Sequence, residues 1–329
     1  MAKILQNAHK IEILEHASTL VEDLLLIEKA GRTCYASEKN EITQETAERF
    51  IKRLIKSGHE SVLEHIPLTY DISNISYSDL AVFLNNTIGA VFARPISLTH
   101  DFIISMNLRT LRDALTIIPQ NKIASALGED ILSRIPWLLE DKYFSTSKTG
   151  QDCKIRWISQ QELNGSPRED LIYLTIKFSG ISRGLTHELV RHRLCSYSQR
   201  STRYVDESSL GLVVPPDSEY SFWQEEAEAL ENMYSHLRKS GEAPEDARQV
   251  LPTGVTTEIV TSARLSQWKY ILRLRTAKAA HWEIRAVMCD LYEELIQRYP
   301  TVFSGLLVRK EWYRGAPYFS PSTDDRKEL

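Results

Sequence analysis

The sequence predicts an α+β fold in which a central, mostly antiparallel sheet is flanked by long helices. Two segments, 67–73 and 171–179, alternate apolar and polar residues as half-buried strands do. Two others, 221–239 and 277–299, repeat apolar residues at the spacing of long amphipathic helices. Because 329 residues can bury a substantial core, we expect a single domain over 1–329 with a large insertion in its first half.

Composition and charge indicate a globular cytoplasmic protein. The hydrophobic fraction of 42% and the charged fraction of 26% are ordinary. A net charge of -4 disfavours a general nucleic-acid or membrane-surface role. No apolar run approaches the ~20 residues of a membrane span, and the N-terminus lacks the apolar core of a signal peptide. The four cysteines form no C-x-x-C pair, which argues against a disulfide framework or a zinc knuckle.

The first part of the chain is expected to run from a strand at 3–14 through helices at 18–29 and 43–57. Thr43 is expected to cap the second helix, with acidic residues in its early turns. Gly58 ends that helix as a C-terminal glycine does. The polar stretch after it is interpreted as a turn before the next strand.

The segment 76–170 is interpreted as an insertion that elaborates the sheet. Its polar stretches predict surface loops at 145–151 and 164–167. Its apolar spacing predicts three helices, at 77–86, 107–118 and 128–141. The strand and helix at its start echo the strand at 171–179 and the helix after it, so a degenerate internal half-repeat is an alternative interpretation.

The second half of the chain alternates helices and strands. A helix is expected at 181–190, a β-branched strand at 256–262 and a helix at 265–275. Pro244 is expected to begin a further helix, because acidic residues follow it. From Arg314 onward the chain is polar, and we expect a poorly ordered tail.

The densest group of polar side chains is the segment 191–204, which contains four arginines, one histidine and three serines but no carboxylate. The helix at 181–190 is expected to carry three side chains on one stripe: Arg183, His187 and Arg191. If the chain is extended after it, Ser201 and Arg203 point the same way. Guanidinium groups beside hydroxyls suit a ligand with phosphates and planar carbonyl-rich rings. A solvated helix end is the alternative.

Four separated blocks of the sequence resemble those of the flavin-dependent thymidylate synthases. Arg191-His192-Arg193, followed after seven residues by Ser201, resembles the family signature, and Arg203-Tyr204 continues the match. The other matching blocks are 58–65, 247–252 and 268–275, the last continuing through Trp282-Glu283. The resemblance covers roughly 10–75 and 170–300 and leaves the middle of the chain unexplained.

The resemblance implies an activity, the reductive methylation of dUMP to dTMP, which makes the protein a methyltransferase of nucleotide biosynthesis. Methylenetetrahydrofolate then supplies the carbon, and NADPH supplies the hydride through a tightly bound FAD. The resemblance also implies a homotetramer whose active sites are shared between subunits. Its substrates are small molecules, and neither nucleic acid nor membrane is an expected partner.

Arg275 resembles the family arginine that stabilises negative charge at N3 of the pyrimidine and so makes C5 more nucleophilic. A guanidinium stays protonated at any working pH, so it suits charge stabilisation rather than general-base catalysis. By resemblance, the residues expected to bind dUMP are Glu188, Arg191, Gln199, Arg200, Ser201, Thr202, Arg203, Arg248 and Arg275. Those expected to bind FAD are Ser61, Arg191, His192, Arg193, Gln199 and Tyr270, and no metal site is expected.

The chain departs from the family pattern at several positions. Glu188 stands where glutamine is commoner, and Gln199 stands where an acid is frequent. Arg264, Ser266 and Tyr270 occupy places where the family has Asn-x-Arg followed by Asn or His. The flavin contacts expected from this helix are therefore in doubt.

An Asn-x-Arg does occur earlier in the chain, at Asn107 and Arg109. We interpret Asn107 as a helix cap and Arg109 as a solvated side chain. The alternative hypothesis is that both residues, as part of the half-repeat, take over contacts to the non-reacting end of the flavin.

Three rival functions fit the sequence less well. His187 and His192 are one residue too far apart for the His-Glu-x-x-His zinc motif, and Arg191 occupies the position that the second histidine needs. A cysteine-dependent thymidylate synthase needs an activated thiolate, but Cys195 is interpreted as a packed small side chain. The third rival is an RNA-binding protein that uses the arginine-rich helix and loop at 183–204.

Overall fold

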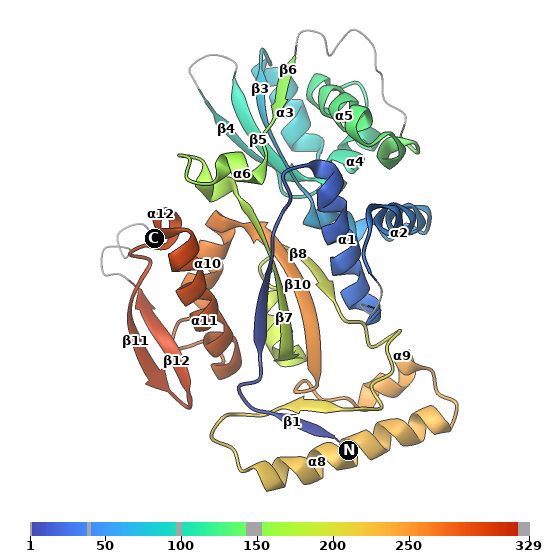
Figure 1. Ribbon diagram of the computed structural model, residues 1–329, viewed down its shortest axis with the longest axis vertical. Coiled ribbons are helices and arrows are strands. Elements are labelled where there is room, and N and C mark those ends of the chain that lie inside the picture. The colour runs from blue at the N-terminus through green and yellow to red at the C-terminus, as the bar shows by residue number, and fades with distance from the viewer. Residues whose placement is uncertain (1, 38–40, 97–100, 143–152, 322–329) are drawn as a thin grey trace. The chain divides into compact units, whose positions relative to one another are not determined.

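A computed structural model describes residues 2–37, 41–96, 101–142 and 153–321 of the chain (Figure 1). Contacts divide the chain into two compact units. The first unit comprises residues 1–14, 31–39 and 174–329, and the second comprises 15–30 and 40–173. The expected insertion therefore lies wholly within the second unit. The loop expected at 145–151 lies outside the described residues.

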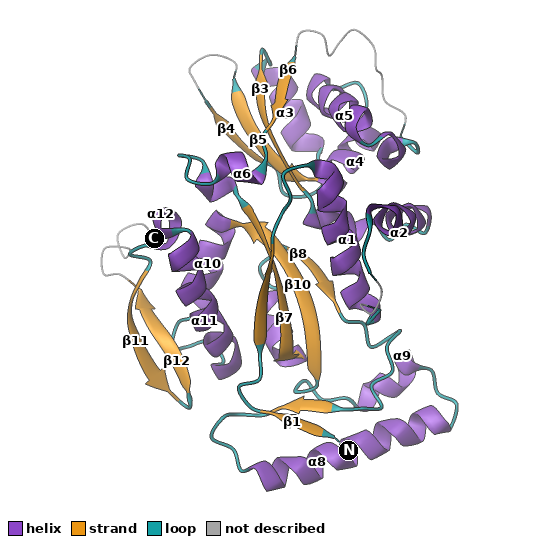
Figure 2. Ribbon diagram, viewed as in Figure 1, coloured by secondary structure: helices purple, strands orange, loops and turns teal. Residues whose placement is uncertain are grey.

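The first unit is built on a four-stranded sheet with helices packed against it (Figure 2). The strand order is β2 (Lys10–Leu14), β7 (Tyr173–Ser182), β10 (Thr256–Arg264) and β8 (Ser196–Gln199). β2 runs antiparallel to β7, and β8 runs antiparallel to β10. The helices of this unit are α7 (Arg183–Leu189), α8 (Tyr220–Lys239), α9 (Pro244–Ala247), η5 (Arg248–Val250), α10 (Leu265–Arg275), α11 (Trp282–Arg298) and α12 (Pro300–Phe303).

Trp268 joins α10 to this sheet. Its fully buried ring lies 6.2 Å from the ring of Phe178 in β7, and its Nε1 donates to the carbonyl oxygen of Leu174 at 3.0 Å. The buried side of α11 contains six of the apolar residues expected from their spacing, namely Ile284, Val287, Met288, Leu291, Tyr292 and Leu295. Trp282, which was also expected there, is only half-buried. Two small sheets complete the unit: β1 (Lys3–Leu5) parallel to β9 (Gly211–Val213), and β11 (Leu307–Tyr313) antiparallel to β12 (Ala316–Pro321).

The second unit contains a four-stranded sheet in which every neighbouring pair is antiparallel. The strand order is β4 (Phe92–Pro95), β5 (Phe102–Asn107), β3 (Pro67–Ser73) and β6 (Lys154–Trp157). Most of α1 (Leu20–Tyr35) belongs to the second unit, and its last turn, from Gly31 onward, belongs to the first unit. The other helices are α2 (Gln44–Lys56), η1 (Glu60–His65), α3 (Tyr77–Asn86), α4 (Leu108–Ile117), α5 (Lys122–Arg134), η2 (Pro136–Leu139), α6 (Gln160–Leu163) and η4 (Glu169–Leu171).

The two four-stranded sheets share one chain pattern. The central strands are β3 and β5 in the second unit and β7 and β10 in the first. In each sheet one edge strand, β4 or β8, comes between the two central strands in sequence and pairs with the later of them, β5 or β10. The later central strand runs directly into a helix in both units, β5 into α4 at Asn107 and β10 into α10 at Arg264. The helices that follow the earlier central strands, α3 and α7, are both capped by serine, Ser76 and Ser182.

The structure confirms the predicted α+β class with antiparallel sheets and several predicted boundaries. The strand at 67–73 and the helices at 77–86 and 265–275 form over those residues. Thr43 caps α2, because its hydroxyl accepts the N–H of Thr46 at 3.2 Å. Gly58 follows α2 at φ +74°, a conformation that glycine adopts without strain.

Several predicted elements are wrong in their bounds. The helix expected at 18–29 continues to Tyr35, and the helix expected at 277–299 begins only at Trp282. The single strand expected at 3–14 is divided into β1 and β2, because Asn7 has a positive φ of 48° that interrupts an extended chain. The helix expected at 128–141 is instead α5, which ends at Arg134. Pro136 follows two residues later and cannot continue an α-helix, so a separate 3₁₀ turn begins there.

The helix expected at 181–190 is also shorter than predicted. β7 continues to Ser182, whose hydroxyl accepts the N–H of Leu185 at 3.0 Å and so fixes the start of α7. α7 ends at Leu189, which leaves Arg191 beyond the helix. The expected helical stripe therefore stops short of Arg191.

The chain around Ser201 forms a turn, so the condition under which Ser201 and Arg203 would point the same way, an extended chain, is not met. The N–H of Val205 donates to the carbonyl oxygen of Ser201 at 3.0 Å. The expectation of a poorly ordered tail from Arg314 is wrong up to residue 321. Arg314 and Gly315, both at positive φ, form a two-residue hairpin turn between β11 and β12.

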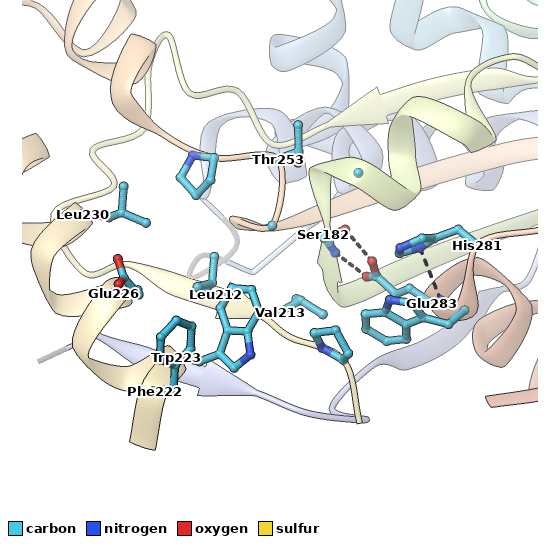
Figure 3. Close-up of a pocket in the computed structure, with 15 residues that line it drawn as sticks. Ser182, Leu212, Val213, Phe222, Trp223, Glu226, Leu230, Thr253, His281 and Glu283 are labelled. Atoms are coloured by element: carbon cyan, nitrogen blue, oxygen red, sulfur yellow. Dashed lines mark hydrogen bonds between the residues drawn. The ribbon is translucent and has the colours of Figure 1, made fainter. Parts of the chain in front are cut away.

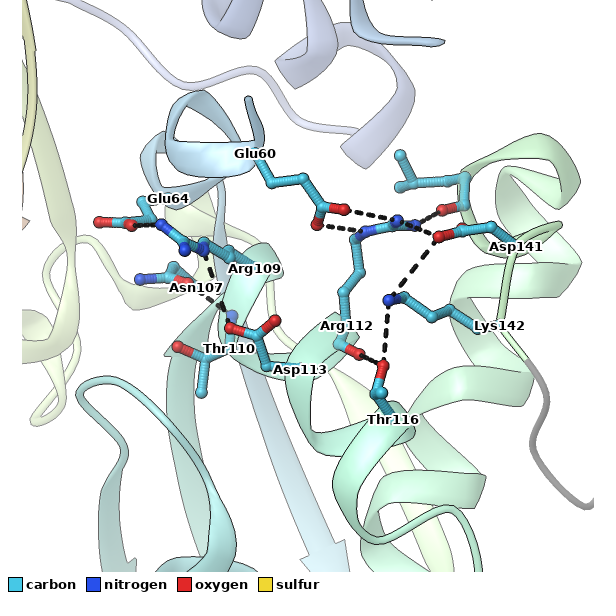
Figure 4. Close-up of polar contacts among 11 residues, drawn as sticks. Glu60, Glu64, Asn107, Arg109, Thr110, Arg112, Asp113, Thr116, Asp141 and Lys142 are labelled. Carbon is cyan, nitrogen blue, oxygen red and sulfur yellow. Dashed lines mark hydrogen bonds and ion pairs between the residues drawn. The ribbon is translucent and has the colours of Figure 1, made fainter. Parts of the chain in front are cut away.

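A buried guanidinium organises the polar part of the second unit (Figure 4). Arg112 in α4 is fully buried, and its Nε and Nη2 bond the two carboxylate oxygens of Glu60 at 3.1 and 3.3 Å. Its Nη2 also bonds Asp141 at 2.8 Å, and its Nη1 donates to the carbonyl oxygen of Leu138. Arg112 thus connects η1, α4 and the segment after η2.

Asn107 and Arg109 lie on the same helix as Arg112 (Figure 4). Asn107 caps α4 as interpreted from the sequence, because its Oδ1 accepts the N–H of Thr110 at 2.9 Å. Arg109 is not simply solvated. Its side chain is 41% exposed and its Nη1 bonds Glu64 at 2.7 Å.

We predict that Arg112→Ala destabilises the protein by roughly 2–5 kcal/mol, because it empties a fully buried position and removes the donor of the Leu138 carbonyl oxygen and of two partly exposed carboxylates. Arg109→Ala, the matched control on the same helix, should cost only about 0.2–1 kcal/mol, since exposed ion pairs contribute little. Equilibrium urea unfolding of both variants measures the difference. Equal losses would contradict the structural role assigned to Arg112.

Candidate active site

Arg275, the expected catalytic residue, is fixed at the end of α10 by three hydrogen bonds. Its Nη1 donates to Glu188 Oε2 at 2.6 Å, and its Nη2 donates to the Glu188 carbonyl oxygen at 3.0 Å. Its Nε donates to His192 Nε2 at 3.0 Å. A guanidinium carries five N–H groups, so two remain for a ligand after these contacts. The charge is therefore positioned before any ligand binds.

His192 accepts from Arg275 only while its imidazole is neutral. Burial, together with the charge of Arg275, lowers the pKa of His192 to about 4. Its ring lies edge-on to that of Tyr270, with centroids 6.0 Å apart and an interplanar angle of 78°. The Tyr270 ring is itself 53% exposed, so it offers an aromatic surface to a ligand.

A second group of arginines gathers around Thr202. Arg248 donates from Nη1 to Thr202 Oγ1 at 3.4 Å and from Nε to the carbonyl oxygen of Glu245 at 3.1 Å. Arg203 bonds the Glu245 carboxylate at 2.9 Å. The hydroxyl of neighbouring Ser201 accepts the N–H of Arg203 at 3.2 Å. Hydroxyls and guanidinium groups in this arrangement suit a phosphate.

Arg200 and Arg183 extend this group. Arg200 bonds the buried carboxylate of Glu207 through two contacts of 3.2 Å. Arg183 donates from Nη2 to the carbonyl oxygen of Arg200 at 2.8 Å. Its buried Nε has no hydrogen-bond partner among the residues that the structure describes. Burial lowers the pKa of Arg183, and the charges of Arg248 and Arg200 act in the same direction. The group therefore concentrates positive charge, as an anion-binding site does.

Arg191 and Arg193 lie exposed on the turn after α7, on either side of His192. Neither guanidinium has an ion-pair partner within the described part of the chain. Large apolar side chains are exposed on this turn, Val190 and Leu194, and on α10, Tyr270 and Leu274. Unpaired cations beside exposed apolar groups suit a ligand that combines phosphates with flat rings.

Cys195 is buried and free of disulfide bonds. Burial raises the pKa of its thiol to about 12, so the thiol is protonated at neutral pH. This agrees with its interpretation as a packed side chain, because only a thiolate is an effective nucleophile.

Gln199 and Ser61 complete the set of expected ligand-binding residues. Gln199 donates from Nε2 to the hydroxyls of Thr186 at 3.0 Å and Thr257 at 3.3 Å. Ser61 lies exposed on η1 of the second unit. The structure gathers the others in the first unit, namely Glu188, Arg191, His192, Arg193, Gln199, Arg200, Ser201, Thr202, Arg203, Arg248, Tyr270 and Arg275.

The sequence interpretation missed Arg183 and Glu207 as members of the site. The sequence places Arg183 only on the helical stripe. Its contact with Arg200 joins α7 to the end of β8, and helical spacing carries no information on such a contact. The unsatisfied Nε of Arg183 is the signal that identifies it. Over the described ranges, no three His, Cys, Asp or Glu side chains are grouped to hold a metal. No described helix has the length and apolar character of a membrane span.

The chain is thus an α+β protein whose first unit contains an arginine-rich group of side chains. Residues 15–88 and 155–301 match the family described as thymidylate synthase complementing protein. The chain belongs to this family, the flavin-dependent thymidylate synthases. The unmatched segment between the two ranges lies inside the second unit.

Relatives named flavin-dependent thymidylate synthase are similar over part of the chain. The protein of Sulfurisphaera tokodaii is 38% identical over 60% of this chain and 78% of its own length. Those of Saccharolobus solfataricus and Pyrococcus furiosus are each 37% identical, over 45% and 38% of this chain. In these two alignments the chain spans 59% and 54% of the relative's length.

Solved structures give weaker likenesses. Thymidylate synthase ThyX from Helicobacter pylori, crystallised with FAD and dUMP, is 23% identical with a TM-score of 0.35, over 40% of this chain and 71% of its own. The UMP/dUMP methylase PolB from Streptomyces cacaoi, bound with 5-Br UMP, is 13% identical with a TM-score of 0.40, over 92% and 94%. Neither score supports an argument about this chain.

We predict that the stability of the protein falls as the pH is lowered from about 6.5 to about 4. The unfolded chain takes up a proton on His192 over this range, whereas the folded protein, with its depressed pKa, does not. Each pKa unit corresponds to about 1.4 kcal/mol, so His192 accounts for roughly 3 kcal/mol. Urea unfolding across this range should show a shallower pH dependence in His192→Gln, which keeps an acceptor for Arg275.

His65 is fully buried, and burial lowers its pKa to about 3. It therefore also reduces stability as the pH falls, equally in His192→Gln and in the unaltered protein. The comparison therefore rests on the difference between His192→Gln and the unaltered protein. Identical slopes would show that His192 is not held neutral by the fold.

Proposed function

We propose that the protein catalyses the reductive methylation of dUMP to dTMP without a cysteine nucleophile. Methylenetetrahydrofolate supplies the carbon, and NADPH supplies the hydride by way of FAD. The observation that carries the proposal is the fixed guanidinium of Arg275, bound to Glu188 and to His192. The membership of the chain in the family supports the same assignment.

Arg275 stabilises the negative charge that the pyrimidine acquires at N3, and this makes C5 more nucleophilic. The bonds to Glu188 and His192 hold its plane, so little reorganisation is needed when the charge develops. Its two remaining N–H groups match the hydrogen-bonding needs of a ring nitrogen and a neighbouring carbonyl oxygen. Glu188 acts on the reaction through Arg275 and also contributes to the dUMP site.

The dUMP phosphate is bound by the arginine group around Thr202. Arg248, which has no carboxylate partner in the described chain, supplies the charge, and Arg203 adds the N–H groups that its ion pair with Glu245 leaves free. The Ser201 and Thr202 hydroxyls supply further hydrogen bonds. Arg200 is already paired with Glu207, so its main effect is to keep this turn in place. Arg191 and Gln199 complete the dUMP set that the resemblance implies.

The residues around His192 fit FAD. The unpaired guanidinium groups of Arg191 and Arg193 suit its phosphates, and the exposed Tyr270 ring suits a flat aromatic system. Ser61, His192 and Gln199 belong to the same proposed set. When bound, FAD supplies the hydride chemistry that no amino-acid side chain provides.

The assembly and the second unit are also matters of proposal. A homotetramer with shared sites agrees with the exposed apolar side chains Val190, Leu194 and Leu274 near the arginine turn. The cytoplasm is its proposed location. The shared sheet pattern supports a degenerate half-repeat in the second unit. Contacts from Asn107 and Arg109 to FAD remain an alternative hypothesis. The comparisons offer no support for the RNA-binding alternative.

We predict that Arg275→Ala lowers the rate of dTMP formation by about 10²–10³, the usual effect of removing a charge-stabilising donor. Flavin reduction by NADPH should remain largely intact, because Arg275 is assigned to the pyrimidine. Stopped-flow flavin reduction and a dTMP assay separate the two steps. A variant that turned over dUMP at nearly the original rate would remove Arg275 from the mechanism.

We predict that Cys195→Ser keeps most of the dTMP synthesis, because the buried thiol is not a nucleophile. Turnover is measured in protein shown to be folded and loaded with flavin. Complete loss of turnover in such a preparation would revive a mechanism that uses a cysteine thiolate.

A further inference from the structure

A cavity of about 550 Å³ lies in the first unit, and none of the site residues described above lines it (Figure 3). Its volume falls in the usual range for small-molecule sites. One wall is a single face of α8, because Phe222, Trp223, Glu226 and Leu230 follow helical spacing. The other walls come from β9, the segment around Pro252, and the first turn of α11.

Aromatic rings dominate the apolar part of this cavity. Phe222 and Trp223 are in edge-on contact, with ring centroids 6.1 Å apart. At the start of α11 the rings of His281 and Trp282 lie 5.1 Å apart. Phe222 is 59% exposed, which places it at the open side. A cavity with two indoles and a phenyl ring favours a flat aromatic ligand.

The charged groups of the lining are all acidic. Glu226 and Glu283 contribute carboxylates, and the lining includes neither lysine nor arginine. His281 adds no positive charge at neutral pH, because burial lowers its pKa and its Nδ1 accepts the N–H of Glu283. The cavity therefore disfavours phosphorylated ligands, in contrast to the arginine-rich site.

The two carboxylates have different roles. Glu283 is buried and accepts both the N–H of Ser182, at 2.6 Å, and its hydroxyl, which ties α11 to the start of α7. Glu226 is exposed on α8 and has no ion-pair or hydrogen-bond partner within the described part of the chain. Glu226 is thus the carboxylate that remains for a ligand.

We propose that this cavity is a second binding site of the protein, which takes a compact aromatic cation. The ring of the ligand packs against the indoles of Trp223 and Trp282, and its positive charge lies near Glu226. Aromatic faces attract cations through their quadrupole, and a carboxylate adds a direct charge interaction. The proposal does not depend on the thymidylate synthase activity, since no residue assigned to that reaction lines the cavity.

Three probes with the same bicyclic ring test the charge preference: N-methylquinolinium, quinoline and quinoline-6-carboxylate. Each is titrated into the full chain by isothermal titration calorimetry at a pH at which quinoline is uncharged. We expect the cation to bind about tenfold more tightly than quinoline, and the anion to bind most weakly. Equal affinity for all three probes would overturn the proposal.

Three variants assign the binding to the cavity. Glu226→Gln should remove the advantage of the cation and leave the affinity for quinoline unchanged. Glu225→Gln, the matched control on the exposed face of the same helix, should leave all three affinities unchanged. Thr253→Trp places a large side chain at an exposed position of the lining and should abolish binding.

Near-ultraviolet circular dichroism verifies that each variant is folded. If Thr253→Trp leaves the titrations unaltered, the probes bind elsewhere and the proposal fails. It also fails if Glu226→Gln retains the preference for the cation, or if Glu225→Gln loses it. Because dTMP synthesis is not the readout, failure here is distinct from failure of the proposed reaction.

Discussion

The contact of Arg275 with Glu188 and His192 connects the two segments from which the site is built, the end of α10 and the end of α7. The contact requires a neutral imidazole, since a protonated ring has no lone pair for the Arg275 donor. Burial and the guanidinium itself keep the ring neutral by lowering its pKa. Arg275 therefore helps to keep His192 neutral, and neutral His192 holds the guanidinium of Arg275 in place. The geometry of the site is maintained only while His192 is unprotonated.

The arginines of the site differ in how their charge is balanced. Arg200 and Arg275 each have a carboxylate partner, which fixes their position and reduces their net attraction for anions. Arg191 and Arg193 have no such partner within the described chain. Their guanidinium groups therefore attract anions, but no ion pair fixes where these groups lie. Positioning and attraction are thus assigned to different side chains. This division suits a site that holds a reacting ring firmly and a phosphate group electrostatically.

The sequence was most informative where a local signal decides the structure. Thr43 predicts the start of α2 because its cap is formed within four residues, and the same holds for Asn107. It was least informative where distant segments decide. The contact of Arg183 with Arg200 joins the start of α7 to the end of β8, and periodicity carries no information on it. The hairpin after Tyr313 was missed because the polarity of the tail outweighed its local turn signal at Arg314 and Gly315.

The two units share a sheet pattern, and they differ in how their arginines are used. In the second unit Arg112 is buried among carboxylates and Arg109 is paired with Glu64, so both are committed to contacts within the unit. The corresponding helix of the first unit, α10, begins without the Asn-x-Arg and ends on Arg275, which retains donors for a ligand. An internal ion pair fixes a guanidinium and lowers its net attraction for anions, which suits Arg109 and Arg112 to a structural role. Arg275 is also paired, with Glu188, but it keeps two N–H groups for a ligand. The second unit thus satisfies Arg109 and Arg112 internally, whereas the first unit also contains Arg191 and Arg193, which have no carboxylate partner in the described chain.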